Sequence, residues 1–206
     1  MPVSADDVAQ SVRLATDTLA TATTGWDKPA GDLTWTCWET TEHIADDLLF
    51  YATQLTRSAT DGWTPFRMAA RREGGPEVAM FADDEAGPAG LLDMVDACGG
   101  LLTAAVRTAA PEARGHHVFG TADAEGFAAM GVVEVLVHTA DVADGLGLPW
   151  HPPAHLCARV LTRLFPEVGP AGDPWQSLLW ATGRATLPDR PQRTEWTWHS
   201  APLERG

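Results

Sequence analysis

The chain is poor in positive charge and in long apolar runs. Lys28 is its single lysine, and 14 Lys and Arg side chains face 28 Asp and Glu, which gives a formal net charge of −14 over 206 residues. Such an acidic chain repels phosphate backbones and anionic lipids, so we expect no nucleic-acid partner. No stretch of ~18 consecutive apolar residues is present, and the N-terminus lacks the basic and apolar segments of a signal peptide. We therefore expect a cytoplasmic protein with no membrane partner.

Cysteine is also scarce. Cys37, Cys98 and Cys157 lie far apart in no paired spacing, so the sequence predicts neither a disulfide framework nor a zinc site built from cysteines. We expect three small buried thiols, and we rank a chemical role for Cys37 below ordinary packing. Nine tryptophans accompany a single tyrosine, and we expect them mainly to pack the core and the loops.

Helical periodicity and capping signals predict an all-α protein. Ser4 is a candidate N-cap for a helix over residues 4–22, which carries apolar side chains at helical spacing. Thr36 and Glu39 form a Thr-x-x-Glu capping box at the start of a second helix that runs to about residue 57. After a long loop with room for a helical turn (58–86), further helices are expected over about 88–110, 122–146 and 153–165, with a short one in the segment 173–188.

We expect a four-helix bundle over residues 1–148 and a short helical and irregular C-terminal extension over 149–206 that packs on it. Near the end of the chain, Trp196 and Trp198 alternate, which predicts an extended segment whose aromatic rings pack on the bundle. In the third helix, Gly99 and Gly100 are expected to let another helix approach closely.

The fourth predicted helix contains the most informative polar residues. Its segment "GVVEVLVHTADVADGL" (131–146) is apolar apart from a few acids and one imidazole, and a projection at 100° per residue puts Glu134, His138 and Asp141 on one narrow stripe. A Glu-x-x-x-His pair is the spacing with which one helix presents two metal ligands at one point. The same pair is common on exposed polar stripes, so these residues alone leave metal ligation and solvent exposure both open.

A third ligand would have to come from another segment. Five histidines lie in loops or near the C-terminus, and we interpret them as ordinary surface or capping residues: His116, His117, His151, His155 and His199. His43 lies in the second helix, off its apolar stripe, so periodicity predicts that it is exposed. The carboxylates around it would raise the pKa of its imidazole and would also attract a divalent cation.

Two segments, taken together, resemble a known family. "LTWTCWETTEHIADDL" (33–48) is similar to the second-helix signature of the DinB-like superfamily, in its branch around mycothiol-dependent maleylpyruvate isomerase. "AEGFAAMGVVEVLVHTADVADGLGL" (124–148) resembles the matching fourth-helix signature, a Glu-x-x-x-His followed by Asp three residues on. The segments stand in the family's order, and the resemblance covers about residues 5–148.

The resemblance implies a DinB-like four-helix bundle with a divalent metal, usually zinc, held by His43, Glu134 and His138. It implies for Asp141 a place behind these ligands or at a thiol site. Three protein ligands leave open positions on a metal, and a cation favours the thiolate form of a low-molecular-weight thiol such as mycothiol. The expected activity is a metal-dependent thiol transfer to a small electrophile, or a thiol-assisted cis–trans isomerisation. The ligand set equally suits nickel and iron.

The tail is too short to be the C-terminal domain of the full isomerase, so the resemblance does not specify the electrophile. Two other hypotheses stay open: a helical bundle that binds a metal or small ligand without catalysis, and an acidic interaction domain with no metal. We expect a monomer or homodimer. An anionic substrate would need arginines, and the nearest sequence cluster is Arg67, Arg71 and Arg72.

Overall fold

The computed structural model describes residues 1–169 and 172–203, and in this part of the chain it contains helices and isolated β-bridges but no strand. The four long helices are α1 (Ala5–Leu19), α2 (Cys37–Thr56), α3 (Gly87–Thr108) and α4 (Ala124–Leu146). A 3₁₀ turn, η1 (Asp84–Ala86), precedes α3, and two shorter helices follow α4: α5 (Ala154–Leu164) and α6 (Pro174–Ala181). The predicted all-α class is confirmed.

Local capping chemistry sets the helix boundaries close to where the sequence predicted them. The Thr36 hydroxyl accepts the Glu39 N–H at 3.1 Å, and the Glu39 carboxylate accepts the Thr36 N–H at 2.9 Å, which completes the predicted capping box of α2. Ser4 caps α1. Asp123 caps α4 by accepting the Gly126 N–H at 2.8 Å.

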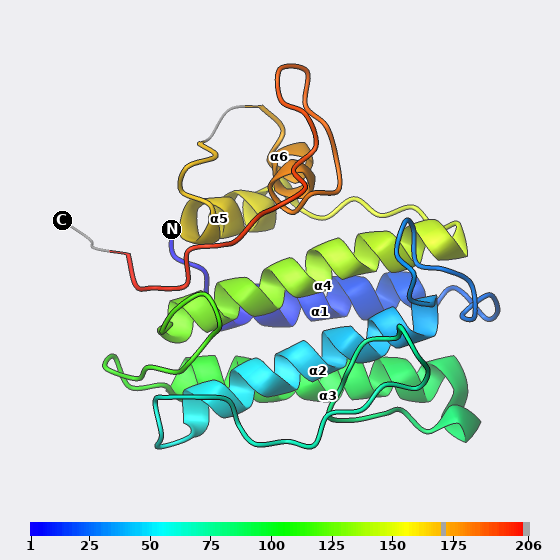
Figure 1. Cartoon of the computed structure of the whole chain (residues 1–206), viewed down its shortest axis with the longest axis horizontal. Helices are drawn as coiled ribbons and strands as arrows, with labels where there is room; N and C mark the ends of the chain where they lie inside the picture. Colours follow the sequence, from blue (N-terminus) through cyan, green and yellow to red (C-terminus); the bar gives the residue numbers. More distant parts are fainter. Residues whose placement is uncertain (170–171, 204–206) are drawn as a thin grey trace.

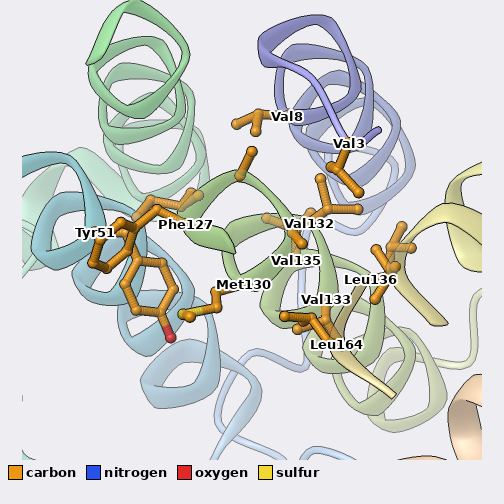
Figure 2. Packing of buried hydrophobic residues seen from close by; sticks show 14 of the residues in the cluster. Val3, Val8, Tyr51, Phe127, Met130, Val132, Val133, Val135, Leu136 and Leu164 are labelled. Atoms are coloured by element: carbon orange, nitrogen blue, oxygen red, sulfur yellow. The ribbon is translucent and has the colours of Figure 1, made fainter. Parts of the chain in front are cut away.

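Helix α4 is apolar on nearly all sides because it lies at the centre of the protein. It packs against α1, α2, α3 and α5, and Figure 1 shows the four long helices side by side with α5 and α6 above α4. In Figure 2, Met130 points toward Tyr51 of α2, and Val133 points toward Leu164 of α5. Different faces of α4 therefore meet different neighbours, and all its residues from Gly126 to Thr139 are buried.

Two segments are long and apolar enough to cross a membrane by length and mean hydropathy. One is α4, and the other consists of η1 and the helix α3 that follows it. In α4, 83% of the apolar window is buried inside the protein, as expected for the core helix of a folded domain, whereas the corresponding share for α3 is 39%. The apolar character of α4 is thus explained by its packing. The expectation of no membrane partner stays a prediction.

One of the two predicted glycine contacts is found. A Cβ atom at Gly99 of α3 would lie 2.6 Å from Val12 of α1, so the absence of a side chain there lets the two helices meet. The prediction for Gly100 is wrong, because its Cα faces outward and a Cβ would have no neighbour within 4 Å.

A buried arginine connects the C-terminal segment to the start of α4 through hydrogen bonds. Arg163 of α5 donates to Asp123 Oδ1 at 3.0 Å and to the carbonyl oxygens of His199 and Ser200 at 2.9 and 3.0 Å. The ring of Trp198 is buried within the main core, as predicted for the tail aromatics, although the segment around it is irregular. The same arginine therefore links the start of α4 to the end of the chain.

Candidate metal centre

The structure brings His43 of α2 together with Glu134 and His138 of α4. Each offers one ligand atom, and these three atoms all lie within 4.8 Å of one another. His138 Nε2 is 3.2 Å from Glu134 Oε2, and the rings of His43 and His138 are 5.0 Å apart at 81°. Glu134 and His138 are buried, so the polar stripe of α4 faces the interior of the protein and not the solvent.

His43 lies at this centre although helical periodicity predicted that it is exposed, and that prediction is wrong. Its side chain is 21% exposed. The projection of α2 identified the stripe that packs in the apolar core, but α4 crosses α2 and also covers a more polar face. A one-dimensional periodicity cannot detect this second contact, since it scores only apolar residues.

The three residues fit a divalent cation in ligand type and in spacing. One carboxylate and two imidazoles are the donors that zinc, nickel and iron accept. Tetrahedral ligands at about 2.1 Å from an ion are separated by about 3.4 Å, close to the 3.2 Å between His138 Nε2 and Glu134 Oε2. The donors come from two adjacent helices, which fixes them on a rigid frame.

Asp141 and Arg184 lie directly behind His138. Asp141 Oδ2 is 3.1 Å from His138 Nδ1, and Arg184 binds both oxygens of Asp141, with its shortest contact, from Nη2 to Oδ2, at 2.7 Å. Nδ1 of His138 thus faces Asp141 and, at 3.3 Å, Nη2 of Arg184, whereas Nε2 faces Glu134 and is the nitrogen that a metal would take. The predicted position of Asp141 behind the ligands agrees with this geometry.

The pKa values of the three residues depend on burial and on their partners. Burial, followed by the nearby charge of His138, lowers the pKa of His43 to about 4, so the expectation that neighbouring carboxylates raise it is wrong. For His138, burial opposes the charged form, but hydrogen bonds to Asp141 and Glu134 outweigh it and raise the pKa. Burial likewise opposes ionised Glu134, yet its hydrogen bond with His138 and the positive charges nearby keep its pKa low.

Two further residues of α2 border the centre. Asp47 Oδ2 is 3.2 Å from His43 Nε2, without hydrogen-bond geometry, and has no other partner among the described residues. Burial, then the charges of Glu134 and Asp46, raises the pKa of Asp47 well above its usual range. Tyr51 is hydrogen-bonded to Glu134. A divalent cation would relieve the repulsion between these crowded carboxylates.

An aromatic ring covers the two imidazoles. The ring of Trp35 lies 5.0 Å from that of His43 at 70° and 6.4 Å from that of His138 at 29°. Trp35 directly precedes the capping residue Thr36, so the well-defined start of α2 also positions this ring. The expected loop-packing role of this tryptophan therefore includes shielding the candidate ligands from solvent.

The arginine beside the centre is not in the predicted cluster. Arg71 is paired with Glu42 at 2.7 Å and Arg72 with Glu39 at 2.8 Å, and Arg67 is exposed. Arg184 lies instead in the loop after α6, 46 residues from His138. No periodicity or spacing in the sequence singles it out, because its partner Asp141 is brought to it by tertiary packing.

The remaining candidates have ordinary environments, with one exception. The three cysteines are free and buried, as predicted, and burial raises the pKa of the Cys37 thiol to about 11. His151, His155 and His199 are exposed. His117 was predicted at the surface, but it is buried among aromatic rings and 5% exposed.

Comparisons with family models, curated proteins and solved structures find no match to this chain.

Changing Arg184 to methionine is expected to weaken zinc binding by about 10- to 100-fold, because Asp141 would lose the partner that holds it against His138. Calorimetric titration of metal-free protein measures the affinity. Arg107→Met is a control with the same charge change, since Arg107 pairs with exposed Asp6 on the surface. Equal affinities in the two variants would contradict a supporting role for Arg184.

Proposed function

We propose that this protein is a DinB-like four-helix bundle that uses a divalent metal to activate a low-molecular-weight thiol of the mycothiol type. His43, Glu134 and His138 would hold the metal, with zinc as the first expectation and nickel or iron as alternatives. The observation that carries the proposal is the convergence of these three donors within 4.8 Å, from two helices, with Glu134 and His138 buried and His43 partly buried. Single Glu-x-x-x-His pairs are common on exposed stripes, but here the pair is buried and a third donor, whose side chain is 21% exposed, lies beside it.

The cation would supply positive charge that favours the thiolate form of the thiol near neutral pH. The residues of the chain prepare the site for this. His43 is neutral at physiological pH, so its lone pair is available; Asp141 fixes the orientation of His138; and Trp35 excludes water from one side. The thiolate sulfur would form a bond to an electrophilic carbon. Transfer then expels a leaving group with its electron pair, whereas isomerisation breaks the same C–S bond after rotation.

We further propose that the partners are small molecules only, a thiol and an electrophile, and that the protein acts in the cytoplasm without nucleic acid or membrane. The formal net charge of −14 supports the proposal that nucleic acid is not a partner. Residues 149–206 would form an extension that completes the centre, since Arg184 reaches Asp141 from there.

Conjugation of a thiol to 1-chloro-2,4-dinitrobenzene tests this activity. We expect zinc-loaded protein to accelerate product formation by at least about tenfold over buffer with one member of a thiol panel that includes mycothiol, since thiolate formation sets the rate. A chelator should remove the effect. The matched control is His155→Ala, which changes an exposed histidine outside the centre. A background rate from protein that retains its metal would instead favour the non-catalytic metal-binding hypothesis.

A further inference from the structure

A pocket of about 430 Å³ adjoins the candidate metal centre, between α2 and the loop that follows it. His43 and Asp47 belong to its lining, so one candidate metal ligand faces both the centre and the pocket. His117, from the loop before α4, closes another part of the wall. The volume falls within the range of sites that hold small organic molecules.

The walls of this pocket are largely aromatic, and several of these rings remain open to solvent. The ring centre of Phe50 lies 5.9 Å from that of Trp63 and 5.2 Å from that of Phe66. In both pairs the ring planes meet edge to face at 88°. Trp63 and Phe66 are 42% and 38% exposed. Large apolar side chains that gather around a concave site, instead of lying scattered over the surface, favour a flat apolar ligand.

His117 supplies a hydrogen-bond donor in the same wall. Its Nδ1 accepts the backbone N–H of Phe119 at 3.1 Å, and the Ser200 hydroxyl lies 3.2 Å from the same atom. A backbone N–H can only donate, so the hydrogen of the neutral ring is on Nε2. Burial favours this neutral form by lowering the pKa of His117 to about 4. No described residue accepts a hydrogen bond from Nε2, although the side chain is almost entirely buried.

The charges of the pocket disfavour anions. The lining contains three carboxyl groups, from Asp46, Asp47 and Glu77, and neither lysine nor arginine. Arg71 and Arg72, which the sequence offered for an anionic substrate, are bound to Glu42 and Glu39 outside the pocket. Apart from a metal held by His43, the pocket would offer a carboxylate ligand no cationic partner in place of the hydration that it loses.

We propose that this pocket binds the electrophile, and that the electrophile is an uncharged, flat aromatic or conjugated molecule with a hydrogen-bond acceptor, such as a nitro or carbonyl oxygen, for His117 Nε2. This inference rests on the proposed function, because it assigns the electrophile to the pocket that His43 shares with the metal centre. The aromatic walls would stack against the ligand, and a lining without lysine or arginine would select against anionic analogues.

Binding of two unreactive probes, without thiol, tests this proposal. Calorimetry on zinc-loaded protein should show that 1,3-dinitrobenzene binds at least about tenfold more tightly than 3,5-dinitrobenzoate, since the two differ by one carboxylate. Trp63→Ala should weaken dinitrobenzene binding by about tenfold, as expected for loss of an aromatic anchor. Trp180→Ala, which changes a partly buried tryptophan outside the pocket, should leave it unchanged.

A second variant should reduce this selectivity. Phe66→Arg places a cation at a partly exposed wall position, where folding does not depend on burial, and should strengthen binding of dinitrobenzoate by about tenfold. Tighter binding of the anion by the wild type, or unchanged dinitrobenzene binding in Trp63→Ala, would overturn the proposal. Metal content is measured on the same samples. Probe binding without metal would refute the proposed metal chemistry alone, and metal without probe binding would refute this pocket assignment alone.

Discussion

Replacing His138 with alanine is expected to weaken zinc binding by more than about 100-fold, which exceeds the usual cost of losing a residue behind a ligand. The substitution removes one of three donors and leaves the Glu134 carboxylate buried without its nearest partner. Elemental analysis of the purified variant should find no stoichiometric metal. The conjugation activity should fall to the background rate for the same reason.

Two further variants make this result specific. Glu134→Gln keeps the volume of the side chain but removes its charge, so it should also lose metal while retaining the helical fold. His155→Ala changes an exposed histidine and should keep full metal content. Wild-type metal stoichiometry in both His138→Ala and Glu134→Gln would show that these residues are not ligands.

Changing Arg163 to methionine is expected to lower the free energy of unfolding by about 2–4 kcal/mol, since two carbonyl groups would each lose a donor at a cost of roughly 1–3 kcal/mol. Arg163 is 1% exposed and donates to Asp123 and to two carbonyl groups near the end of the chain. Methionine fills a similar space but leaves the two carbonyl groups without this donor and Asp123 without its cationic partner. The N-terminal end of α4 and the C-terminal segment should loosen together.

Urea unfolding followed by circular dichroism measures this loss. The control is Arg107→Met, because Arg107 pairs with Asp6 on the surface and both side chains are more than half exposed; its effect should stay within about 1 kcal/mol. If the free energy of unfolding of Arg163→Met lay within about 1 kcal/mol of the wild-type value, Arg163 would not be the main residue that holds the C-terminal segment on the bundle.

The helices were predictable because their boundaries are set by local chemistry. The side chains of Thr36 and Glu39 each accept the other's backbone N–H at the start of α2, and the Asp123 side chain accepts the Gly126 N–H at the start of α4. Neighbouring residues therefore suffice to locate both starts. The apolar pattern also identified α4 as a packed helix. Its burial on nearly every side follows from four neighbouring helices, which no single segment of sequence specifies.

The candidate site was predictable only in part. The stripe of Glu134, His138 and Asp141 follows from helical spacing, but His43 was placed with it by resemblance and not by periodicity. Its low pKa shows why local sequence misled: the carboxylates nearby in sequence matter less than burial beneath α4. Arg184 and the buried His117 were missed, because their partners lie 43 and 83 residues away. The DinB-like assignment itself stays a prediction.

The most direct test of a metal centre at His43, Glu134 and His138 is a calorimetric titration of metal-free wild-type protein with zinc, followed by elemental analysis of the dialysed complex. Binding of one ion per chain, retained after dialysis and lost in His138→Ala, is the predicted result. A protein that binds no ion, or binds zinc equally well without His138, would contradict the account.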